Sequence, residues 1–448
     1  MKTWLKNPLA ILVDDQIDSR GGIVIEDDKI LELVALGDEP SMMVDRIIDA
    51  SEQVILPGLV NTHHHFYQTL TRAHPDAINK ELFAWLKSLY PVWAGLTEEM
   101  IHVSTRLAGV ELLLSGCTTA ADHHYIFPET AREALDIQVD AINSVGIRAT
   151  LTRGSMSLGE DEGGLPPRNT IQTEDAILAD CERVISKYHC SDEGAMLQVA
   201  LAPCSPFSVS RALMRDAALL ARDKGVMLHT HLAENDEDIA YSLEKFDCRP
   251  GQYAEDLGWT GADVWHAHCV KLDGSEIDLF ARTRTGVAHC PCSNCRLGSG
   301  IAPVRALRDA GVRTGLGVDG SASNDTGNLM AEARQCMLLQ RVASGAGAMS
   351  AREALEIATL GGAEVLNRPD CGSLEIGKCA DIAIWDMSGV DSAGNWDPAA
   401  ILLAGPTLAR DVFVNGRHVV AEGRITTLDQ RALAAQQNVQ VKALRERA

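Results

Sequence analysis

The chain has 448 residues and a formal net charge of −22 without a basic block, so DNA or RNA would be repelled and is excluded as a ligand. Hydrophobic residues make up 46% of the chain and aromatics 4%, and no apolar run is long enough to span a membrane. The first residues lack a signal-like apolar region and the twelve cysteines are scattered, so we expect reduced thiols, a cytoplasmic location and a small-molecule ligand.

Three regions differ in their pattern. Residues 1–57 and 366–448 contain short strand-like pieces, with a helix-like end at 427–448, and we expect both flanks to combine into one small β-sandwich. Residues 58–365 alternate short apolar strands with helix-like stretches. This alternation, with strands at 55–61, 118–123, 148–153, 197–203, 226–231, 264–268, 286–290 and 313–319, predicts an α/β fold with a (β/α)8 barrel of the TIM type.

The first barrel strand runs into two histidines, His63 and His65. Side chains at i and i+2 of a strand point to the same face, so this pair has the arrangement of half a metal site.

Later strands end in comparable side chains. The strand at 226–231 ends in His231, with Glu234 three residues on. The strand at 264–268 ends in His268, and that at 313–319 ends in Asp319. Because active sites of such barrels form at the C-terminal ends of the strands, we expect these side chains to meet in one site.

These motifs resemble those of the amidohydrolase superfamily: Pro-Gly-Leu-Val-Asn-Thr-His-x-His at 57–65, His231-x-x-Glu234, His268, Asp319 within Gly-Val-Asp-Gly, and the C-terminal stretch from Gly372. Members with two metals carry a bridging lysine at the end of strand four. Neither 148–153 nor 197–203 contains a lysine. The resemblance therefore implies one metal, as in the deaminase and s-triazine hydrolase branch.

Within that branch the chain is most similar to bacterial 8-oxoguanine deaminases, on the segments 63–72, 81–86, 89–93 and 202–207. Nucleoside deaminases of the branch usually carry histidine where Cys204 stands, which counts against a nucleoside. The resemblance implies a hydrolase of C–N bonds in cyclic amidines that converts 8-oxoguanine to urate and ammonia. Guanine, isocytosine and s-triazines such as hydroxyatrazine remain alternatives, whereas the complete set of site residues opposes a non-enzymatic scaffold.

The resemblance also implies roles. The ligands of one divalent ion would be His63, His65, His231 and Asp319. Three nitrogens and one oxygen suit Zn²⁺, and Fe²⁺ is tolerated by such sets. The ion would supply hydroxide at neutral pH for attack on the carbon that bears the amine.

The catalytic side chains would be Glu234, His268 and Asp319. Glu234 would transfer a proton to the ring nitrogen. His268 would orient the hydroxide or stabilise the charged intermediate, and Asp319 would also carry the second proton to the leaving amine.

Substrate contacts are expected at Gln68, Cys204 and Trp93. The Gln68 amide could pair with a purine edge, and Cys204 is small enough to admit an oxygen at the purine 8-position. Trp93, with Tyr90, would form an aromatic lid, the alternative being core packing. The remaining histidines near the strands, such as His229, are expected to orient ligands rather than bind metal. The family likeness also leads us to expect a homo-oligomer.

Overall fold

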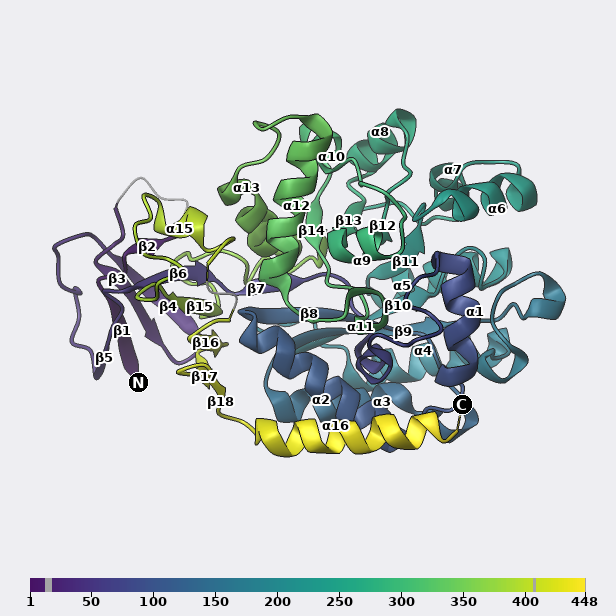
Figure 1. Cartoon of the computed structure of the whole chain (residues 1–448), viewed down its shortest axis with the longest axis horizontal. Coiled ribbons are helices and arrows are strands. Elements are labelled where there is room, and N and C mark those ends of the chain that lie inside the picture. Colours follow the sequence, from purple (N-terminus) through teal and green to yellow (C-terminus); the bar gives the residue numbers. More distant parts are fainter. Residues whose placement is uncertain (13–17, 406–407, 448) are drawn as a thin grey trace.

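The computed structural model describes residues 1–12, 18–405 and 408–447, and its centre is a closed parallel barrel (Figure 1). The barrel order returns β14 to β7, so the sheet has no free edge. This confirms the predicted (β/α)8 fold. The barrel strands are β7 (Leu59–Asn61), β8 (Cys117–His124), β9 (Arg148–Ser155), β10 (Leu197–Pro203), β11 (Leu228–Leu232), β12 (Val264–His268), β13 (Gly286–His289) and β14 (Thr314–Leu316).

Helices surround the barrel, and several begin and end where their sequences favour it. Thr97 and Ser210 accept hydrogen bonds from the backbone at the starts of α2 and α5, as N-caps do. Gly146 and Gly225 end α3 and α5 in the left-handed conformation. The helices along the barrel are α1 (Leu82–Trp93), α2 (Glu98–Leu114), α3 (Ala134–Val145), α4 (Glu174–Tyr188), α5 (Arg211–Lys224), α6 (Asp236–Phe246), α7 (Pro250–Asp256), α8 (Gly274–Thr283), α9 (Pro291–Arg296), α10 (Val304–Asp309), α11 (Ser321–Asn324), α12 (Leu329–Ser344), α13 (Ala351–Glu356) and α14 (Gly362–Val365).

Two predicted elements are each divided in the structure. The run at 55–61 separates at Gly58 into β6 (Gln53–Pro57), which lies outside the barrel, and β7 inside it. A Cβ at Gly58 would lie 2.1 Å from the Thr118 side chain, so only glycine fits at this crossing. The helix-like stretch between the predicted strands at 226–231 and 264–268 breaks because Asp247 adopts a left-handed conformation and Pro250 begins a new helix.

Two sheets beside the barrel are built from the flanks. The first has the order β4 (Lys29–Val34), β3 (Gly22–Glu26), β1 (Lys2–Lys6) and β5 (Arg46–Asp49). The second has the order β18 (Arg424–Ile425), β17 (Arg417–Ala421), β16 (Asp411–Val414), β15 (Ile382–Asp386), β6 and β2 (Ala10–Ile11). In it Ile55 pairs with Ile384, so both ends of the chain share one sheet, at the left of Figure 1.

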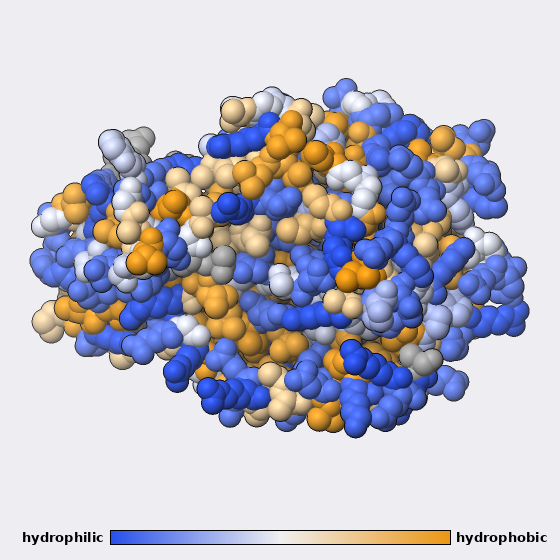
Figure 2. Space-filling model, viewed as in Figure 1, coloured by the Kyte–Doolittle hydropathy of each residue, from blue (hydrophilic) through white to orange (hydrophobic). Residues whose placement is uncertain are grey.

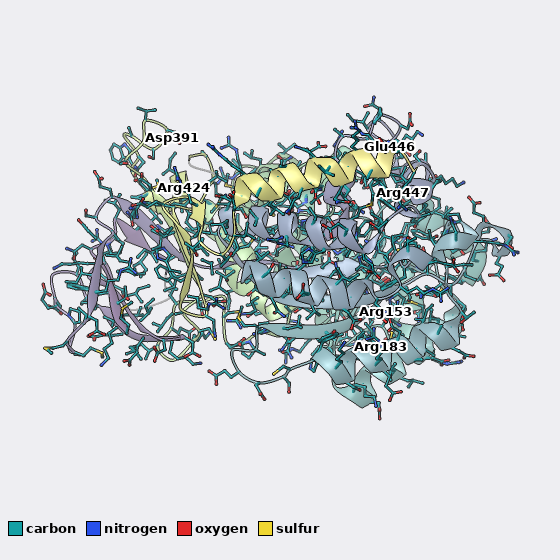
Figure 3. The ribbon with its side chains drawn as sticks, turned by 90° about the horizontal axis from the view of Figure 1, so that it is seen from below. Arg153, Arg183, Asp391, Arg424, Glu446 and Arg447 are labelled. Carbon is teal, nitrogen blue, oxygen red and sulfur yellow. The ribbon has the colours of Figure 1, made fainter. Side chains whose placement is uncertain are left out.

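Buried contacts join these sheets to the barrel. Arg148, at the start of β9, makes two 3.1 Å hydrogen bonds to the Asp381 carboxylate just before β15, and both side chains are buried. The C-terminal helix α16 (Gln430–Arg445) packs along α2, as Figure 3 shows from below.

The surface is mixed. Hydrophilic residues cover most of the face in Figure 2, and hydrophobic residues gather in patches between them. Within the described residues, every helix is too short or too polar to cross a membrane.

Candidate active site

A pocket lies where the barrel strands end, and helix α1 closes it. Each of its side chains is at most 9% exposed, so the site is shielded from water. Apolar residues of α1 line the pocket together with the predicted histidines and carboxylates. The pocket is lined by His65, Gln68, Leu82, Trp85, Leu86, Tyr125, Cys204, Phe207, His231, Glu234, His268, Leu297 and Asp319.

The strand ends bring together two overlapping groups of side chains that could hold a metal ion. Within each group the donor atoms lie within 4.8 Å of one another, and both groups contain His63. Asp319 Oδ1 lies 3.3 Å from His63 Nε2 and 3.1 Å from His65 Nε2. The groups are His63, His65, His123 and His231, and His63, His268 and Asp319.

Hydrogen bonds fix the protons of two of these imidazoles. His65 Nδ1 lies 2.7 Å from the His123 carbonyl and His231 Nδ1 lies 2.6 Å from the Cys204 carbonyl, and a carbonyl only accepts. Burial lowers the pKa of His231 to about 3, so its ring is neutral and its single proton is on Nδ1. His65 Nε2 and His231 Nε2 lie 3.2 Å apart. The lone pair of His231 Nε2 is directed at His65 Nε2, an arrangement that suits a divalent cation bound between the two rings.

A hydrogen bond from His63 to His229 fixes the proton of His63 on Nδ1. His229 Nδ1 donates to the Trp265 carbonyl at 2.9 Å, and burial lowers the pKa of His229 well below the usual range, so its Nε2 is an acceptor. His63 Nδ1 lies 2.8 Å from that acceptor and donates to it. His63 Nε2 therefore also presents a lone pair to the site. The signal in the sequence was the spacing of His229 and His231, which places both on the same face of β11.

His123 joins the group although it was not predicted as a ligand. Its Nε2 donates to the Ala202 carbonyl at 2.9 Å, and its ring stacks on that of His231 with centroids 4.6 Å apart. The stacking restricts the orientation of the His231 ring.

Glu234 and His268 lie together at the pocket wall, with Glu234 Oε2 3.5 Å from His268 Nε2. Burial raises the pKa of Glu234 well above its usual range, which favours the protonated form of the carboxyl. His268 Nδ1 donates to Asn294 Oδ1 at 2.9 Å, which turns Nε2 toward the pocket.

The backbone at two strand ends is unusual. His268 and Asp319 have φ values of 71° and 58°, a left-handed conformation that costs energy for residues other than glycine. Asp319 Oδ2 accepts hydrogen bonds from the hydroxyls of Ser293 at 2.6 Å and Ser323 at 2.9 Å. These bonds leave Oδ1 directed at the histidines.

The predicted substrate contacts separate into two that line the pocket and one that does not. Gln68 and Cys204 are both in its wall. Trp93 is not among the lining residues: it donates from Nε1 to Thr71 at 3.2 Å and packs behind the pocket. The tryptophan of α1 that faces the pocket is Trp85, whose ring centroid is 5.5 Å from that of Trp93. The position of Trp93 fits the core packing that the sequence left open as the alternative to a lid.

The amidohydrolase family model matches residues 54–419. The 8-oxoguanine deaminase of Pseudomonas aeruginosa is 48% identical over 444 residues, covering 99% of both chains. An isoxanthopterin deaminase from an unknown prokaryotic organism is 36% identical and covers 99% of this chain and 97% of its own. The crystal structure of atrazine chlorohydrolase from Arthrobacter aurescens TC1 complexed with zinc superposes with a TM-score of 0.93 at 34% identity, over 98% of this chain and all of that one. The chain belongs to the amidohydrolase family.

Proposed function

We propose that the protein is a deaminase of a free purine base that uses one divalent metal ion, with 8-oxoguanine as substrate. Water replaces the exocyclic amine at the amidine carbon, which gives urate and ammonia. The observation that carries the proposal is the shielded pocket in which His63, His65 and His231 come together with Asp319, beside Glu234, whose pKa is raised by burial. The identity to a named 8-oxoguanine deaminase over the whole chain supports the choice of substrate.

The metal proposed for this site is Zn²⁺, with His63, His65, His231 and Asp319 as its ligands. Three imidazole nitrogens and one carboxylate oxygen suit zinc, and a structural relative at 34% identity binds it. When bound, such an ion lowers the pKa of a coordinated water to about 7.

Each side chain around this centre would have a separate role in the reaction. Glu234 lies in the pocket wall, and burial raises its pKa well above the usual range, so it would donate a proton to the ring nitrogen beside the reacting carbon. His268 Nε2 faces the same space and would contact and orient the attacking oxygen. Asp319 would pass the second proton of water to the amine, which leaves as ammonia.

The pocket offers a polar anchor for the base. Gln68 is fully buried, and among the described residues neither atom of its amide has a hydrogen-bond partner. A buried amide without partners is unfavourable, and a purine edge with one donor and one acceptor would satisfy it. Cys204 would leave room for the 8-oxygen, and Trp85 would pack on the base.

The test is ammonia release from 8-oxoguanine, guanine, isocytosine and hydroxyatrazine by protein loaded with Zn²⁺, with ethylamine measured in parallel. We expect 8-oxoguanine to have the highest kcat/KM. Ethylamine from hydroxyatrazine, without ammonia from any purine, would refute the purine assignment and favour s-triazine hydrolysis.

A further inference from the structure

A buried carboxylate outside the pocket, Glu332 of α12, connects two helices that carry site residues. It is 1% exposed and does not line the pocket. Its Oε2 accepts a hydrogen bond from the Cys292 amide of α9 at 3.0 Å. Its Oε1 accepts one from Asn324 Nδ2 of α11 at 2.7 Å. One carboxylate therefore holds both helices.

The residues beside these two contacts orient the active site. On α9, Ser293 donates to Asp319 Oδ2 and Asn294 accepts from His268 Nδ1. On α11, Ser323 donates to the same Asp319 oxygen. The bonds made by Glu332 thus lie one or two residues from each group that holds Asp319 and His268.

The two helices need such support because they are short. Helix α9 has six residues and α11 has four, so neither is stable by its own hydrogen bonds. An ion pair between Arg296 and Asp325, at 3.1 Å, also links their ends, but both side chains are partly exposed and such pairs contribute little. Helix α12, with sixteen residues, is the longer support, and Glu332 is where it bonds to both.

We propose that Glu332 is a positioning residue for the reaction, acting through α9 and α11 on Asp319 and His268. Both of its partners are donors, so each oxygen of Glu332 serves as an acceptor. A glutamine would place its own NH₂ group against one of them. Asn324 cannot turn to compensate, because its Nδ2 also donates to the carbonyl of Val318, the residue before Asp319.

Glu276 of α8 provides a control. It is 4% exposed and accepts from the Gly251 amide at 2.8 Å and the Asp273 amide at 2.9 Å. It also pairs with Arg249 Nη2 at 2.7 Å, and it lies outside the pocket wall. Glu276→Gln should therefore lower stability as Glu332→Gln does, without changing the geometry of the site.

The experiment compares kcat, KM and the rate of Zn²⁺ loss to a chelator in both variants, each corrected for folded protein. We expect Glu332→Gln to lower kcat at least tenfold with KM within about twofold, and to speed metal loss by about 10- to 100-fold, the effect typical of groups that orient metal ligands. Glu276→Gln should match the wild type in all three. Equal kcat and metal loss in the two variants would overturn the proposal.

If Glu332→Gln folds poorly, a second pair of variants tests the same proposal. Asn324→Ala removes one of the two bonds, so its effect and that of Glu332→Asp should combine to less than the product of the separate losses. Independent, multiplicative losses would contradict an action through α11. The inference rests on the proposed function, but metal loss is measured without substrate, so a wrong substrate and a wrong role for Glu332 give different results.

Discussion

Gly320, the residue after Asp319, controls the position of the proposed substrate anchor. A Cβ built on Gly320 would lie 1.8 Å from Gln68 Oε1 and 2.3 Å from its Cδ. The φ of Gly320 is −75°, which alanine adopts without strain. In a Gly320→Ala variant the backbone can therefore stay in place while the end of the Gln68 side chain must move.

The loss can be calculated from the contacts that Gln68 would make. Its amide offers one donor and one acceptor to the base, and a neutral hydrogen bond contributes about 0.5–1.5 kcal/mol. Losing both costs about 1–3 kcal/mol, which corresponds to a decrease in kcat/KM of about 5- to 150-fold. Thermal stability should change little, because only a flexible side chain is displaced.

The assay is kcat/KM for 8-oxoguanine with zinc content measured on the same samples. Gly274→Ala is the control, since a Cβ there has no atom within 4 Å. Gln68→Ala should show a loss similar to that of Gly320→Ala. Wild-type kcat/KM in Gly320→Ala, with zinc retained, would refute the role of Gln68 as the anchor.

Three further predictions concern the centre and its supports. Glu234→Gln should lower kcat by about 10²- to 10⁴-fold with zinc retained, as measured by turnover and metal analysis; full turnover would exclude its proton-transfer role. His229→Leu should weaken zinc binding by about 10- to 100-fold in chelator competition, because His63 loses its acceptor. Burial raises the pKa of Glu332 to about 7 from 4.5, so the wild type should lose up to about 3 kcal/mol of stability as the pH rises through this range. Urea unfolding at pH 5 and pH 8 should show that Glu332→Gln lacks this part of the dependence.

The sequence predicted the barrel and the positions of its polar side chains because both follow from local patterns. A strand that ends in His or Asp places that side chain at one rim of a parallel barrel, independently of how the surrounding helices pack. For this reason His231 and Asp319 could be placed before the structure was known. The ends of elements were predicted less accurately. The apolar run through Gly58, for example, was read as one strand, but it forms two strands in different sheets.

Contacts between residues far apart in the chain could not be predicted in this way. Helix α1 carries tryptophans at both 85 and 93, and which one faces the pocket depends on how the helix packs. The partners His63 and His229 are 166 positions apart in the chain. Glu332 and its α9 partner Cys292 are 40 positions apart. Periodicity contains no information on such pairs.

The pairing of β6 with β15 has a consequence for the order of folding. Ile55 pairs with Ile384 only after most of the chain has been synthesised, whereas barrel strands that follow one another in the chain pair over shorter separations. During translation β6 therefore has an open edge, and it is exposed to misassembly until the C-terminal strands emerge. Shortening the chain before β15 would leave this edge unpaired permanently, so aggregation is expected to increase before the metal centre itself is altered.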